Sequence, residues 1–254
     1  MIVTPATLGL LAAASFGAGF VDAIAGGGGL ISLPALLAAG LPPHLALGTN
    51  KGQATFGALS SAVSYWRRGS VDRARAPVAF LCAMVGSFAG AALLLAVRPE
   101  PLRPVVIVML VLAAVVVTAR PRGSGQALAT SLQLPAAAAV TFALGAYDGF
   151  FGPGVGTMLI VAFSLIYGEG AARASGNAKV ANLASNLAAM LLFSIRGTVL
   201  WKVALPMAAA NAAGAAVGAR VALARGDRFV RAVALVVVAA LVVKLAFDWV
   251  RTLR

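Results

Sequence analysis

Charged residues are scarce in this chain. Only 11% of its 254 residues are charged and just 7 are acidic, whereas 61% are hydrophobic. A soluble domain of this length is about a quarter charged. With so few polar side chains the chain cannot cover a water-facing surface, so much of its surface must face lipid. We therefore predict an integral membrane protein.

Cysteine and histidine are nearly missing as well, with Cys82 and His44 as the sole examples. One cysteine cannot form an internal disulfide or a thiolate cluster. His44 has no carboxylate near it in sequence, which favours a solvated loop histidine over a proton shuttle. The chain also lacks metal-ligand spacing, a Ser-His-Asp order and the motif GxxxxGK[ST]. These absences argue against an enzyme, an ATP-driven pump, and a metal or other cofactor.

Basic residues outnumber acidic ones, which gives a formal net charge of +13. They gather at the ends of apolar stretches, as in Arg67-Arg68 and Arg225-Gly226-Asp227-Arg228. This distribution is typical of membrane loops at the cytoplasmic face. Since no basic face with interleaved aromatics is present, we expect no nucleic-acid partner.

The apolar stretches lack the alternating pattern of a membrane β-barrel, so they predict helices and an all-α polytopic protein. Eight are long enough to cross a hydrocarbon layer of roughly 30 Å. The second and seventh are short and follow glycine-rich breaks, as half-helices would. The ten segments lie near residues 7–25, 29–41, 46–66, 77–97, 103–119, 134–149, 155–167, 176–195, 203–223 and 229–250.

The two halves of the chain resemble each other, which predicts a duplication. Asp22 matches Asp148, Lys51 matches Lys179, and Arg68-Gly69 matches Arg196-Gly197 in the same order. The predicted units are a first repeat at 1–119, a polar connection at 120–133 and a second repeat at 134–254. Loop charges fit parallel and inverted repeats equally well. We favour inversion because it places the two glycine breaks on opposite faces, as alternating access requires.

Two of the acids, Asp22 and Asp148, end long apolar segments just before the glycine breaks. A carboxylate inside a membrane segment costs about 3 kcal/mol, so it usually marks a pathway, a proton relay or an ion pair. We predict that these two residues couple proton movement to transport. The alternatives are a cap for the following short helix and neutralisation of a nearby lysine.

The glycine breaks themselves are Gly26, Gly27, Gly28 and Gly29 in the first half, and Gly152-Pro153-Gly154 in the second. Each break is followed by a new helix, whose free N–H groups and positive dipole end can hold an anion. We predict loops that line a substrate site. The alternative is close helix packing, which suits the spaced pairs Gly86/Gly90 and Gly214/Gly218 better.

A third group of polar residues follows each break, with Lys51 and Lys179 expected to open long apolar helices. Asn182 and Asn186 share one helix face with Lys179. A polar stripe of this kind lines a cavity or an interhelical seam. The alternative for the lysines is that they extend to the lipid headgroups.

The stretch GFVDAIAGGGGLISLPALLAAGLPPHLALGTNK, followed by YWRRG, resembles the TauE/SafE-type sulfite exporter family, as does GNAKVANLASNLAAMLLFSIRGTV in the second half. The resemblance implies a permease of the bacterial inner membrane. Its substrates would be small sulfur-containing anions, such as sulfite or organosulfonates, moved by a proton gradient. By motif position, the implied site contains Asp22, Gly26, Gly27, Gly28, Gly29, Thr49, Asn50, Lys51, Gly152, Gly154, Asn177, Lys179 and Asn182.

We therefore expect a multi-pass secondary transporter of the cell inner membrane, with a small anion as substrate and lipid around it. The lysines would supply positive potential, the glycine loops directional N–H donors, and Asp22 or Asp148 a coupling proton. Two alternatives stay open: an anion channel, and a membrane scaffold or assembly factor that transports nothing. The oligomeric state is also open, a homo-oligomer included.

Overall fold

The computed structural model describes residues 4–98 and 127–225, together with 102, 105, 106, 108–110, 112 and 113. The long elements in this part of the chain are all α-helices, which confirms the all-α class. They are α1 (Pro5–Ala25), α2 (Gly29–Ala38), α3 (Pro43–Arg67), α4 (Ala76–Ala96), α6 (Thr130–Phe150), α7 (Val155–Tyr167), α8 (Ala171–Ile195) and a last helix, Trp201–Arg225.

Four of these helices are long and apolar enough to cross a membrane: Pro5–Ala25, Ala76–Ala96, Ala172–Ile195 and Trp201–Arg225. The two expected half-helices appear as the short apolar helices α2 and α7. The predicted segment 103–119 falls largely outside the described residues, and 229–250 falls entirely outside them. The count of eight spans thus stays a prediction.

The helices begin and end where the local sequence directs. Pro5 and Pro43 each stand in the first turn of a helix, where a missing N–H costs nothing. α1 ends at Gly26, whose φ of 74° is unfavourable for any residue with a β-carbon. Gly154, with a φ of 88°, precedes α7 in the same way. The glycine clusters therefore interrupt helices, as the sequence predicts.

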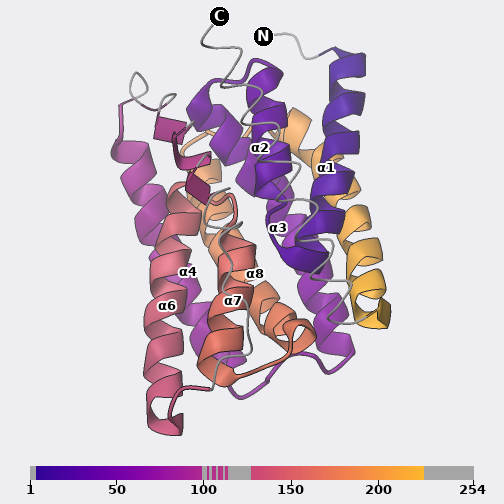
Figure 1. Ribbon diagram of the computed structural model, residues 1–254. Helices are drawn as coiled ribbons and strands as arrows, with labels where there is room; N and C mark the ends of the chain where they lie inside the picture. Colours follow the sequence, from indigo (N-terminus) through magenta and orange to yellow (C-terminus); the bar gives the residue numbers. More distant parts are fainter. Residues whose placement is uncertain are drawn as a thin grey trace, which may run out of the picture.

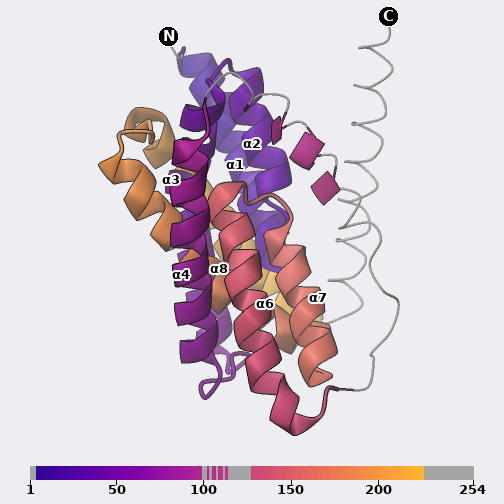
Figure 2. The same ribbon diagram turned by 90° about the vertical axis from the view of Figure 1, so that its left-hand side faces the viewer.

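The two breaks touch each other. Thr157, in the first turn of α7, donates a hydrogen bond of 2.8 Å to the carbonyl oxygen of Ala25 at the end of α1. A β-carbon on Gly26 would lie only 2.2 Å from the amide nitrogen of Thr157. From this meeting point α2 extends through the upper half of the molecule and α7 through the lower half (Figures 1 and 2). This opposition is what inverted repeats would produce, although the repeat itself stays a prediction.

Small residues let the long helices approach closely. α4 packs against α6 and α8. A β-carbon on Gly90 of α4 would lie 1.9 Å from the carbonyl oxygen of Ala146 on α6. Gly214 and Gly218 of the last helix face the main chain of α1 at Phe16 and Phe20 in a similar way. The spaced glycine pairs therefore serve packing between membrane helices.

This packing predicts different effects for two glycine substitutions. Gly90→Ala pushes α4 away from α6 and should cost about 1–3 kcal/mol of stability, the usual cost of overpacking. Gly17→Ala is the matched control, because nothing lies within 4 Å of the added carbon. Thermal unfolding of the two purified variants in detergent measures the difference. Equal melting temperatures would show that α4 and α6 are not in close contact.

Candidate functional site

The two lysines lie deep inside their helices. Lys51 and Lys179 were expected to open helices, but α3 begins at Pro43 and α8 at Ala171, so this part of the prediction is wrong. Lys51 is 2% exposed and Lys179 0%. Since neither ammonium group reaches the surface, extension to the lipid headgroups does not explain them.

Lys51 forms a buried ion pair with Asp148 of α6. Its Nζ lies 2.6 Å from Asp148 Oδ1 and also donates to Asn186 Oδ1 at 3.3 Å. The other carboxylate oxygen, Oδ2, accepts a hydrogen bond from the Ser185 hydroxyl. Both charges are thus matched inside the protein, as a buried pair requires.

Lys179 forms a second ion pair, with Asp22 of α1. Its Nζ lies 2.9 Å from Asp22 Oδ2 and also donates to the main-chain oxygen of Asp22. Gly28 N–H donates to Asp22 Oδ1 at 3.3 Å, and Asn182 Nδ2 to Oδ2 at 3.5 Å. Asp22 therefore neutralises a lysine and also accepts from an amide at the start of α2, which were its two alternative roles.

The pairs are reciprocal. Lys51 of the first half meets Asp148 of the second, and Lys179 of the second half meets Asp22 of the first. The four residues come from α1, α3, α6 and α8, so the ion pairs join the two halves of the chain across their interface. Residues far apart in sequence are thereby fixed around one point.

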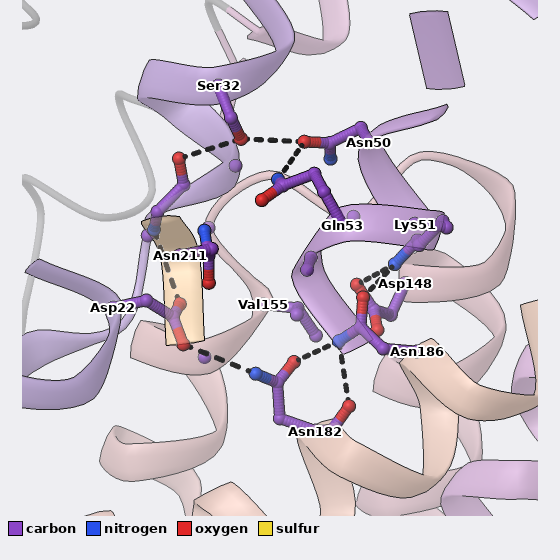
Figure 3. A pocket seen from close by; sticks show the side chains of 17 residues that line it. Asp22, Ser32, Asn50, Lys51, Gln53, Asp148, Val155, Asn182, Asn186 and Asn211 are labelled. Carbon is purple, nitrogen blue, oxygen red and sulfur yellow. Dashed lines mark hydrogen bonds and ion pairs between the residues drawn. The ribbon is translucent and has the colours of Figure 1, made fainter. Parts of the chain in front are cut away.

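A cavity of about 30 Å³ lies at this point, which is room for a few water molecules or a small ion. Ten of the residues expected in the site line it, and Figure 3 shows several of them turned toward one another. These ten are Asp22, Gly27, Gly28, Gly29, Asn50, Lys51, Asp148, Gly152, Gly154 and Asn182. The other lining residues are Ser32, Gln53, Ala54, Val155, Gly156, Asn186 and Asn211.

Uncharged side chains joined by hydrogen bonds line one side of the cavity (Figure 3). Asn50 Oδ1 accepts from Ser32 Oγ at 2.6 Å and from Gln53 Nε2 at 3.0 Å. Gln53 Oε1 in turn accepts from Ser15 Oγ at 2.8 Å. The Asn50 amide nitrogen has no protein partner within the described ranges, so it is a donor available to a molecule in the cavity.

Four expected site residues lie outside the cavity lining. Lys179 contacts Asp22 but does not line the cavity, and Gly26 packs against α7. Thr49 Oγ1 accepts a hydrogen bond of 3.1 Å from Leu200 N–H, and Asn177 Oδ1 accepts one of 2.8 Å from Asp72 N–H. Thr49 and Asn177 therefore bind connecting loops in this structure, and their role in substrate binding stays a prediction.

The loops that Thr49 and Asn177 bind lie directly on α3 and α8. A β-carbon on Gly48 would lie 2.4 Å from the carbonyl oxygen of Thr198, and one on Gly176 would lie 2.2 Å from that of Ser70. Each glycine thus lets a loop pass directly over the helix. We call these two contacts the Thr198 seal and the Ser70 seal.

Ion pairs reinforce the Ser70 seal. Arg75 lies 3.2 Å from Asp72 and 2.9 Å from Glu169. Arg173 lies 3.8 Å from each of the same two acids, and Asn177 Nδ2 donates to Glu169 at 2.8 Å. Burial raises the pKa of Glu169, against the opposing effects of the Asn177 hydrogen bond and the two arginines.

Sequence reasoning missed three polar residues of the site, each with a detectable signal. Ser185 stands between Asn182 and Asn186 on the polar stripe. Ser32 follows the first glycine break by one turn of helix. Asn211 is an amide in the otherwise apolar segment 203–223, and its Nδ2 donates to the carbonyl oxygen of Ser15 at 3.1 Å. A polar residue within an apolar segment is therefore as informative about the site as a charged one.

An all-helical membrane protein with interrupted helices and paired charges around a central cavity has the features of a membrane transporter. Residues 11–245 match the family model of the sulfite exporter TauE/SafE, and the chain belongs to this family.

The relatives carry transporter names. The "Probable membrane transporter protein YfcA" of Escherichia coli K12 is 35% identical over 248 residues, which cover 97% of this chain and 92% of the relative. The "Probable membrane transporter protein ORF9" of a Sinorhizobium species is 38% identical over 250 residues, covering 97% and 95%. A "Probable membrane transporter protein" of Haemophilus influenzae is 34% identical over 242 residues, covering 95% of both chains. No solved structure matches the chain.

The buried pair predicts a stability effect that is independent of transport. Lys51→Met leaves Asp148 without its partner and should cost about 3–5 kcal/mol. The double variant Lys51→Met/Asp148→Asn removes both charges and should recover most of that loss. Thermal unfolding of the parent, the single and the double variant measures the coupling. A double variant less stable than the single one would contradict a direct ion pair.

Proposed function

We propose that this protein is a proton-coupled secondary transporter of the bacterial inner membrane for a small anion of the sulfite or organosulfonate class. The observation that carries the proposal is the pair of reciprocal Lys–Asp contacts where two interrupted helices meet beside a cavity. The family membership supports the sulfur-containing substrate class.

The charge balance of the site supports proton coupling. In the closed arrangement two lysines face two aspartates, so the ion pairs carry no net charge. An added anion brings an unpaired negative charge into a poorly solvated site, which is strongly unfavourable. A proton taken up by one aspartate removes that excess charge. One proton should therefore enter with each monoanion.

Neutral donors around the cavity support recognition of oxyanions. The Asn50 amide nitrogen is available, and α2 and α7 both begin at the cavity with Gly29 and Val155. Helix N-termini and free amides bind anion oxygens without another full charge. Interrupted helices at the centre of the membrane use the same device in other secondary transporters.

The two seals favour a carrier over a channel. A channel needs a continuous path, whereas the Thr198 and Ser70 loops lie directly on α3 and α8. A non-transporting scaffold would have no use for an unpaired amide donor facing a cavity among buried charges. We therefore expect substrate to be enclosed during transport.

Proteoliposomes containing the purified protein test the proposal. Labelled sulfite, methanesulfonate, sulfoacetate and acetate serve as probes in a counterflow assay. We expect saturable counterflow of sulfite or a sulfonate, and accumulation when a pH gradient is imposed. Liposomes without protein are the control. Non-saturable conductance would indicate a channel. If the protein transports none of the probes, the proposal is refuted.

A further inference from the structure

We propose that the two ion pairs have different tasks, a conclusion that rests on the proposed function. Lys179–Asp22 is the exchangeable pair: Asp22 takes up a proton, leaves Lys179, and the substrate anion replaces its carboxylate. Lys51–Asp148 is the fixed pair, which stays closed and holds α3 to α6.

Exposure distinguishes the pairs. The Asp22 side chain is 21% exposed, whereas that of Asp148 is 2% exposed. Asp22 lines the cavity and Lys179 does not, so Asp22 stands between the lysine and the cavity. Movement of this one carboxylate uncovers a positive charge to whatever occupies the cavity. Lys51, by contrast, already lines the cavity together with its partner Asp148, so no carboxylate stands between this lysine and the cavity.

Hydrogen bonding also distinguishes the exchangeable pair from the fixed pair. Asp148 receives Lys51 at 2.6 Å on one oxygen and the Ser185 hydroxyl on the other. Asp22 receives Lys179 at 2.9 Å, and its further hydrogen bonds, from Gly28 and Asn182, are long, at 3.3 Å and 3.5 Å. Long hydrogen bonds are weak, so the Asp22 carboxylate is held less firmly.

Lys179 keeps its position when the carboxylate leaves. Its Nζ also donates to the main-chain oxygen of Asp22, a contact that does not depend on the side chain. The ammonium group therefore stays anchored through one hydrogen, while the hydrogen that the carboxylate held becomes available. An anion oxygen then occupies the place of Asp22 Oδ2, next to the Asn182 amide.

The exchange conserves charge. A proton binds the Asp22 carboxylate to give a neutral acid, the ion pair with Lys179 breaks, and a monoanion forms a new one. The charged and polar groups that face Asp22 are Lys179 and Asn182 on α8, Lys51 on α3, Asp148 on α6 and the Gly28 amide. Among them, the fixed pair Lys51–Asp148 adds no net charge. Release of the anion and the proton on the other side restores the starting state.

The test compares Asp22→Asn with the matched variant Asp148→Asn. Methanesulfonate is the probe for pH dependence, because a sulfonate stays ionised throughout the working range and leaves the protein as the titrating partner; sulfite is measured in parallel. In the parent, binding that takes up one proton from solution should weaken about tenfold for each unit by which the pH is raised. Asp22→Asn imitates the protonated acid permanently, so its affinity should not vary with pH.

In proteoliposomes, Asp22→Asn should lose accumulation driven by a pH gradient but retain exchange at equal pH, because exchange moves no net proton. Asp148→Asn should transport more slowly and still show the pH slope of the parent. If it does not fold, the neutral pair Lys51→Met/Asp148→Asn replaces it.

Two results would overturn the division of tasks: accumulation retained in Asp22→Asn, or the pH slope abolished in both the Asp22 and the Asp148 variants. Neither result would refute anion transport itself. The proposed transporter function fails instead if the parent protein transports none of the probes or conducts them without saturation.

Discussion

The structure depends on the rule that a charge placed among apolar helices must meet an opposite charge. Lys51 and Lys179 obey it by pairing with Asp148 and Asp22 from the other half of the chain. Each half of the chain thus supplies the counter-charge for the buried lysine of the other half. The same requirement brings the two glycine breaks together, because each aspartate stands just before a break. The two ion pairs therefore contribute both to the stability of the fold and to the geometry of the site.

The breaks would be costly anywhere else in a membrane, since unpaired backbone groups cannot face lipid. Here they face each other and the cavity. Thr157 donates to the carbonyl oxygen of Ala25, and Gly28 N–H donates to Asp22. The free backbone groups are thus used for contact between the halves and for stabilising a carboxylate. Glycine is required at Gly26 and Gly154, where φ is positive.

The sequence predicted the helices and both breaks well, because apolar length and glycine clusters are local signals. It also identified Asp22, Asp148, Lys51 and Lys179 as charged residues within apolar segments, where charge is unusual. It did not reveal which residues pair, as partners on different helices leave no local trace. For the same reason the sequence did not reveal that Thr49 and Asn177, predicted in the site by motif, form hydrogen bonds with connecting loops.

The two seals are built alike but differ in the number of charges they contain. The Thr198 seal has one hydrogen bond from Leu200 to Thr49, while the Ser70 seal adds the charges of Asp72, Arg75, Glu169 and Arg173. A difference of about 1.4 kcal/mol corresponds to a tenfold difference in population. In an alternating-access cycle the empty protein would then rest mostly with its Ser70 end shut. Such a bias would give the proposed transporter a preferred resting conformation, set by a few loop charges rather than by the binding site.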